Sequence, residues 1–121
     1  MRNRSGDRIM PPGKSIIILN EDEGWLYCWN RQEYRRDGLG GLPECTLFRN
    51  EGKRLSSEII LECEKVLVEC HPNWPRCAFT YVDPRFVESP NPGYCFKKAG
   101  WRKIDKSKNL GLLLMMKIIK P

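Results

Sequence analysis

The stretch NPGYCFKKAGWRKIDKSKNLGLLLMMK, from Asn91 to Lys117, decides the fold expected for this chain. Its Pro-Gly start and short amphipathic run predict a helix over Gly93 to Ala99 that ends at Gly100. Two apolar runs follow, Trp101 to Ile104 and Leu110 to Ile119, and the Lys-Ser-Lys-Asn sequence between them is typical of a turn. We therefore expect a short helix that leads into a β-hairpin.

Upstream of this stretch, the sequence predicts three strands. Ser15 to Leu19 and Trp25 to Trp29 are apolar runs joined by a polar loop that ends in glycine, which indicates a hairpin. The polar, Gly-rich segment from Gln32 to Pro43 is typical of a mobile connection. Cys45 to Phe48 is the third expected strand.

Spacing of three and four residues between apolar side chains, with glutamates between them, predicts a helix from Ser56 to Cys70. Ser56 or Ser57 can cap its first amides. Arg76 to Val82 is aromatic and β-branched, which indicates a strand, and a loop from Arg85 to Pro92 follows it. A strand, helix, strand unit among hairpins predicts an α+β fold whose mixed, mostly antiparallel sheet contains one parallel pair.

Length and composition favour one folded domain. The chain has 121 residues, a formal charge of +6 and a basic first segment, residues 1–14, that we expect to be flexible. No apolar run approaches the roughly 20 residues that cross a bilayer, and the start is too polar for a secretory signal. We therefore expect a soluble, cytoplasmic protein without a membrane partner, whose charge suits an anionic partner such as a nucleotide cofactor or nucleic acid.

The six cysteines do not have the spacing of a zinc site. There is no C-x-x-C pair, and the only histidine, His71, directly follows Cys70. Most of the cysteines lie in apolar stretches, where a thiol behaves as a small buried hydrophobe. We expect reduced core thiols and no metal.

The loop FRNEGKRLSS, from Phe48 to Ser57, combines a glycine, basic side chains and hydroxyls where the long helix begins. Helix N-termini carry unpaired amides and partial positive charge, so phosphates bind there readily. Glu51 and Glu58 oppose an anion. An ordinary helix start with basic neighbours explains the loop equally well.

Together, this loop and the stretch from Asn91 resemble the second half of the GNAT acyltransferase fold, over Glu44 to Lys117. The resemblance implies acetyl-coenzyme A or another acyl-coenzyme A, its pyrophosphate held by loop amides in a pattern that Arg49 and Gly52 match. Arg54 stands where the family has a small residue, so the loop is longer, with Ser56 at the close approach, or the phosphate site is altered or lost. The cofactor-binding residues that the resemblance implies are Phe48, Arg49, Asn50, Gly52, Lys53, Arg54, Ser56, Ser57, Asn91 and Phe96.

Acyl transfer to an amine also needs a base and, in many family members, a tyrosine that protonates the leaving thiolate. The candidate bases are Glu44 and Asp83, each beside a predicted strand. Phe96 occupies the position that matches the family tyrosine, so the candidate proton donor is Tyr94. A turn role for Asp83 and a partly buried aromatic role for Tyr94 remain open, and we expect His71 to complement the dipole of its helix.

The chain lacks the first strand and two helices usual in the family, so its acceptor pocket is reduced, supplied by the segment from Gln32 to Pro43, or completed by a second subunit of a homodimer. The resemblance implies a compact, phage-type N-acyltransferase, with a nucleic-acid base as one acceptor by analogy with phage Mom DNA-modification proteins. Two alternatives are a nucleic-acid-binding module on a degenerate GNAT scaffold and an interaction protein that docks a partner on its sheet edge or Trp-rich hairpin. In the binding module, phosphate contacts come from Arg49, Lys53, Arg54 and the segment from Lys97 to Lys108.

Overall fold

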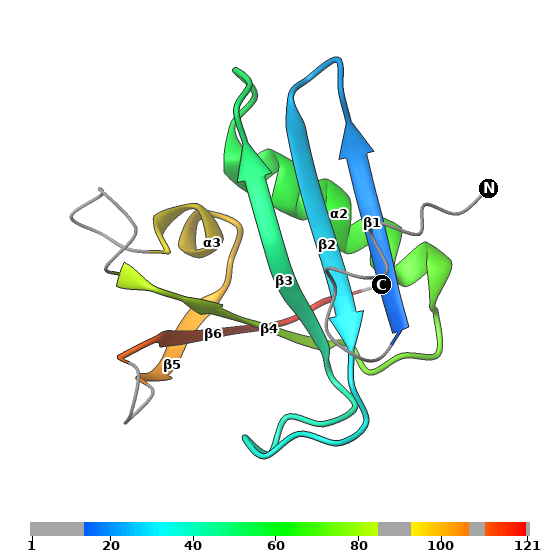
Figure 1. The fold of residues 1–121 in the computed structure, drawn as a ribbon, viewed down its shortest axis with the longest axis vertical. Coiled ribbons are helices and arrows are strands. Elements are labelled where there is room, and N and C mark those ends of the chain that lie inside the picture. Colours follow the sequence, from blue (N-terminus) through cyan, green and yellow to red (C-terminus); the bar gives the residue numbers. More distant parts are fainter. Residues whose placement is uncertain (1–13, 85–92, 107–110, 121) are drawn as a thin grey trace.

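A computed structural model of the chain describes residues 14–84, 93–106 and 111–120. In this part of the chain, six strands form one sheet and two helices accompany it (Figure 1). In chain order the elements are β1 (Lys14–Asn20), β2 (Trp25–Arg31), β3 (Pro43–Asn50), α2 (Ser56–Cys70), β4 (Cys77–Val82), α3 (Tyr94–Lys98), β5 (Arg102–Lys106) and β6 (Leu113–Ile118).

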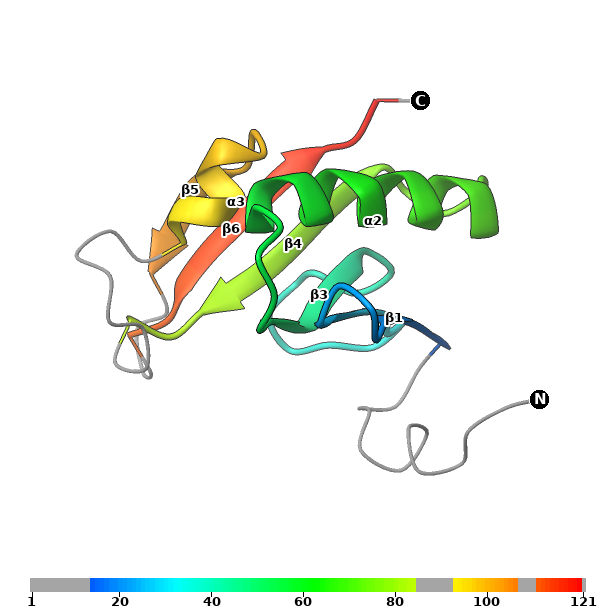
Figure 2. The same ribbon diagram turned by 90° about the horizontal axis from the view of Figure 1, so that it is seen from above.

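The strands follow the order β1-β2-β3-β4-β6-β5 across the sheet. Only β3 and β4 pair in parallel, and α2 connects them, while the other neighbours are antiparallel. Figure 2 shows both helices on the same face of the sheet, with α3 beside the first turn of α2. The expected α+β fold, with a mixed sheet and one parallel pair, is confirmed.

The strand β3 is longer than its apolar run. It begins at Pro43 and ends at Asn50, because its backbone pairs with β2 from Arg31 to Trp25 whatever the polarity of the side chains. The pairing contains a bulge opposite Cys28 and Trp29. The loop expected from Arg85 to Pro92, the turn residues 107–110 and nearly all of the basic first segment lie outside the described residues.

The core lies between α2 and the sheet. Buried side chains at helical spacing on α2, among them Ile59 and Cys63, pack against the aromatic residues of β2. The Trp29 indole donates a hydrogen bond of 2.9 Å to the Cys63 carbonyl oxygen and stacks on Trp101, with ring centroids 6.3 Å apart. This contact holds the start of the terminal hairpin against the first one.

A buried carboxylate also lies on the core side of α2. Glu64 is 5% exposed, and it accepts hydrogen bonds from the Trp101 indole at 2.9 Å and from Lys117 Nζ at 2.8 Å. Lys117 Nζ donates a further bond of 2.7 Å to the Ala99 carbonyl oxygen, just after α3. Burial of a charge is unfavourable without such partners, so these bonds fix α2, α3 and β6 relative to one another.

We expect Lys117→Met to destabilise the protein by roughly 3 kcal/mol, because it leaves the Glu64 carboxylate buried without its cation. The double variant Glu64→Gln/Lys117→Met should recover most of this loss, since it leaves no buried charge. Urea denaturation followed by tryptophan fluorescence measures both effects. Lys65→Met, an exposed change on α2 beside Glu64, is the control and should stay within about 0.5 kcal/mol of the wild type. A loss of stability in Lys117→Met no larger than that of this control would contradict the prediction.

Candidate functional site

The parallel strands β3 and β4 separate after a single paired position. Glu44 and Phe79 are register partners, and one residue further on the Thr80 hydroxyl donates a hydrogen bond of 2.8 Å to the Cys45 carbonyl oxygen. Beyond this point the described residues of the two strands have no common register, and Figure 1 shows their C-terminal ends diverging with α3 beside them. We call this region the β3–β4 divergence.

Aromatic side chains pack where the strands diverge. The rings of Phe48 from β3 and Phe96 from α3 meet edge to face, with centroids 6.3 Å apart, and Phe96 also packs on Trp101. Phe96 is 7% exposed, whereas Tyr94 is 52% exposed. The structure therefore brings together two of the expected cofactor-binding residues, and it places Tyr94 on the outside of the short helix, away from the buried position of Phe96.

The Asn50 side chain organises the loop at the C-terminal end of β3. Its oxygen accepts a bond of 3.0 Å from the Gly52 amide, and its nitrogen donates to the Arg54 carbonyl oxygen at 2.8 Å and to the Ser56 hydroxyl at 3.0 Å. One of the amides expected to face a pyrophosphate thus already has a partner within the loop.

Gly52 is also required by its packing. A Cβ atom at this position would lie 1.8 Å from the Glu23 carbonyl oxygen in the turn between β1 and β2. The Glu51 amide donates a bond of 2.8 Å to the Gly24 carbonyl oxygen of the same turn. Close approach of two backbones is a sufficient reason for glycine here, whether or not a phosphate binds.

The expected serine cap of α2 is wrong. The N-cap residue is Leu55, which makes no side-chain cap bond, and the Ser56 hydroxyl instead accepts a bond from Asn50. No described residue accepts a hydrogen bond from the Ser56 or Ser57 amide. These two amides remain available to water or to an anion.

The charges of this loop fall into two groups. Arg54 lies among carboxylates, 2.7 Å from Glu62, 3.2 Å from Glu23 and, through Nε, 3.7 Å from Glu58. Its charge is therefore compensated within the protein. Arg49 and Lys53 are exposed and have no ion-pair partner among the described residues, so they are the cations that can meet an anion here.

Glu44 belongs to a charged cluster that the segment from Gln32 to Pro43 brings to the start of β3. Arg35 forms ion pairs with both Glu44 and Asp37, the latter at 2.7 Å, and the Tyr81 hydroxyl donates a bond of 3.0 Å to Asp37. We call these four residues the Arg35 cluster. The Arg35 guanidinium lies 4.9 Å from the centre of the Phe79 ring.

The Arg35 cluster lies on the sheet face that α2 does not cover. Ala78 is part of the core beneath α2, so its neighbour Phe79, which meets Arg35, points to the opposite face. A ligand bound on the helix face and a second ligand bound beside the Arg35 cluster on the opposite face can therefore meet at the opening between β3 and β4.

The two carboxyl groups of the cluster are shifted in opposite directions. Burial raises the pKa of Glu44, and Arg35 only partly offsets this shift. Hydrogen bonds from Arg35 lower the pKa of Asp37. Burial and the bond to Asp37 raise the pKa of Tyr81. The two carboxyl groups therefore suit different roles: Asp37 stays ionised, and Glu44 can exchange a proton nearer neutral pH.

The remaining candidates are dispersed. Asp83 directly follows β4 and is partly buried, and Asn91 lies outside the described residues. His71 is the C-cap residue of α2 and stacks on Trp74, with ring centroids 3.8 Å apart. The sequence analysis named Glu44 as a candidate base but did not name its partners Arg35, Asp37 and Tyr81. The density of charge before the glycines is the only sequence signal for Arg35 and Asp37, and Tyr81, on β4, has no such signal.

The cysteines are free thiols, and half of them are buried: Cys28, Cys45 and Cys63. Burial raises the pKa of Cys45 to about 12, which makes it a poor nucleophile. Within the described part of the chain, no three His, Cys, Asp or Glu side chains come close enough to hold a metal ion.

No family model matches this chain, and no curated protein sequence matches it. Among the described residues, neither helix has the length and apolar character needed to span a membrane.

We expect Gly52→Ala to lower the free energy of unfolding by about 1–3 kcal/mol, because the added Cβ displaces the turn that carries Glu23. Urea denaturation measures this loss. Lys53→Ala, an exposed change in the same loop, is the control and should cost less than about 0.5 kcal/mol. Equal stability of the two variants would show that the close backbone approach does not constrain this position.

We expect Asp37→Asn to reduce stability at pH 7 more than at pH 3. The pKa of Asp37 lies below its ordinary value of 3.8, so its contribution is present above that pH and is lost as the pH falls through the lowered pKa. Urea denaturation at the two pH values measures the change. Asp22→Asn removes an exposed carboxylate and should show no such difference, and an equal deficit of Asp37→Asn at both pH values would rule out the ionic role.

Proposed function

We propose that this chain is an acyl-coenzyme A-dependent N-acyltransferase on a compact GNAT-like core, with acetyl-coenzyme A as the expected donor and an amine as the acceptor. The observation that carries the proposal is the β3–β4 divergence. Two parallel strands joined by α2 pair at one position and then leave their facing backbone edges without a common register. An extended ligand that carries amide groups can pair with such an edge, and the arm of coenzyme A has two amides.

The loop at the C-terminal end of β3 supports the phosphate end of this ligand. Arg49, Lys53 and the open amides of Ser56 and Ser57 supply positive charge and donors. Glu51 and the carboxylates around Arg54 oppose an anion in the same loop. We therefore expect binding that weakens markedly as salt increases.

The Arg35 cluster supports the acceptor side. Glu44, whose pKa is raised by burial, is the group that would take a proton from the amine, and Asp83 is the second candidate. When bound, acyl-coenzyme A supplies an activated acyl group as a thioester. An unpaired β3 amide would stabilise negative charge on the carbonyl oxygen, and Tyr94, if α3 shifts, would hold a proton for the leaving group.

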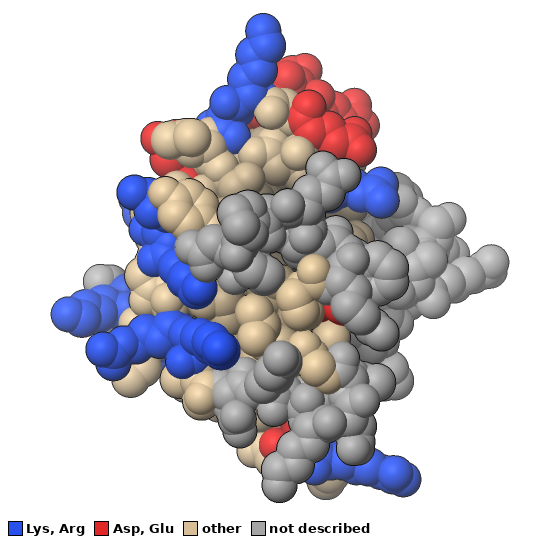
Figure 3. Space-filling model, turned by 90° about the vertical axis from the view of Figure 1, so that its left-hand side faces the viewer, with Lys and Arg blue, Asp and Glu red and all other residues tan. Residues whose placement is uncertain are grey.

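The distribution of positive charge supports a nucleic acid, either as the acceptor of the acyl group or as the partner of a chain without catalysis. Lys97, Lys98, Arg102 and Lys103 are exposed on α3 and β5. Figure 3 views the side of the molecule that lies on the left in Figure 1. Lys and Arg side chains gather along its left margin, while acidic side chains gather at the upper right, toward the end of the molecule where the β1–β2 turn lies. This basic surface is the specific support for the alternative, a nucleic-acid-binding module without catalysis.

A thermal-shift titration with acetyl-coenzyme A and with duplex DNA separates the two functions. At a hundredfold excess over its Kd, a ligand of the native state adds about 2.7 kcal/mol to the apparent stability. Lys53→Glu should weaken the response to acetyl-coenzyme A, and Lys14→Glu, the same charge change on β1, should leave it unchanged. No response to acetyl-coenzyme A, together with a salt-sensitive response to DNA, would replace the acyltransferase by the binding module.

A further inference from the structure

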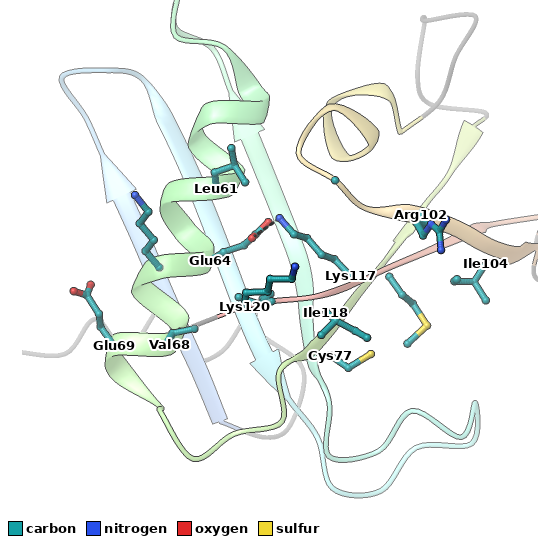
Figure 4. Close-up of a pocket in the computed structure, with 14 residues that line it drawn as sticks. Leu61, Glu64, Val68, Glu69, Cys77, Arg102, Ile104, Lys117, Ile118 and Lys120 are labelled. Atoms are coloured by element: carbon teal, nitrogen blue, oxygen red, sulfur yellow. Dashed lines mark hydrogen bonds and ion pairs between the residues drawn. The ribbon is translucent and has the colours of Figure 1, made fainter.

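A groove of about 1080 Å³ lies between α2 and the end of β6 (Figure 4). Leu61 and Val68 line it from the helix, and Ile118 and Ile104 line it from the strands. The groove contains no residue of the Arg35 cluster and none of the loop at the end of β3.

The groove exists because β5 is shorter than the strand beside it. The pairing of β5 with β6 begins at Arg102 and Met116, so the residues of β6 after Met116 have no described strand on that side. Ile118, in this uncovered part, is 73% exposed. Ile104 is 55% exposed and Leu61 is 41% exposed. Three large aliphatic side chains thus meet water around one hollow, and exposed apolar surface of this kind marks a binding site more often than chance.

The groove also carries an excess of positive charge. Glu64 and Lys117, which both line it, compensate each other through their bond of 2.8 Å. Lys65, Arg102 and Lys120 have no ion-pair partner among the described residues, and Glu69 is the remaining carboxylate among the lining residues. An apolar hollow with unpaired cations at its margins complements a molecule that has an aliphatic part and a negative head.

We propose that this groove binds a free fatty carboxylate, that is, a single aliphatic chain with one anionic head. Its volume lies just above the range of about 300–1,000 Å³ usual for small-molecule sites. The chain would lie along the uncovered edge of β6, against Leu61 and Val68 on the side of α2 and against Ile118, which points to the other side of the strand from Lys117. The carboxylate would meet the unpaired cation Lys120, since Figure 4 shows Arg102 at the other end of the groove beside Ile104. The site goes beyond the proposed acyl transfer and does not depend on it.

Isothermal titration calorimetry with laurate, below its micelle concentration, tests the proposal. We expect saturable binding of one laurate per chain and tighter binding of myristate, since each fully buried methylene strengthens binding about fourfold. Dodecyltrimethylammonium, with the same chain and the opposite charge, should bind at least tenfold more weakly. Ile118→Asp should reduce laurate affinity at least tenfold and Lys120→Glu at least threefold, while Leu19→Asp, at another exposed aliphatic position on β1, should not change it.

Urea denaturation of each variant establishes that it is folded before its binding is compared. The proposal is overturned if laurate does not saturate, if the cationic amphiphile binds equally well, or if Ile118→Asp binds like the wild type. It is also overturned if the protein binds only anionic vesicles, which would make the groove a membrane contact. A concentration-dependent dimer that Ile118→Asp abolishes would instead identify a second copy as the occupant. The acetyl-coenzyme A titration tests the proposed acyl transfer separately. The two sites share no residue, so failure to bind laurate does not affect the acetyl-coenzyme A result, and the reverse also holds.

Discussion

The carboxylate of Glu64 is buried on α2, and it can remain there because the Trp101 indole and the Lys117 ammonium both donate to it. This arrangement matters for the sheet as a whole. The sheet has two halves, one made of β1, β2 and β3 and the other of β4, β6 and β5. The two halves share only one parallel register position, between β3 and β4. Much of what holds them in place therefore comes from α2, which packs on the first half through its apolar face and binds the second through Glu64.

Because α2 holds the two halves of the sheet together, the two central strands, β3 and β4, can diverge without separating those halves. The Thr80 hydroxyl satisfies the Cys45 carbonyl oxygen where the ladder ends, and Phe48 and Phe96 fill the helix side of the widening gap. The backbone contact between Gly52 and the β1–β2 turn then positions the loop that precedes α2. The geometry proposed for acyl transfer thus rests on the first hairpin as much as on the elements that carry the candidate residues.

The sequence predicted the parts of the fold that local patterns determine. The bounds of α2 follow from regular apolar spacing, and the short helix follows from the glycines at its two ends. The serine cap was wrong because the Asn50 side chain, six residues away from Ser56, takes its hydroxyl as an acceptor. The Arg35 cluster was missed because Tyr81 reaches Asp37 across 44 residues, a separation that no periodicity records.

The long reach of Glu64 has a consequence for how the protein is made. Its two donors lie 37 and 53 residues later in the chain, so a nascent chain that has just completed α2 has neither of them. Until β6 is synthesised, the core-facing side of the helix carries an uncompensated carboxylate, which disfavours its burial against the first hairpin. The order of translation therefore favours an α2 that stays undocked until β6, which carries Lys117, emerges.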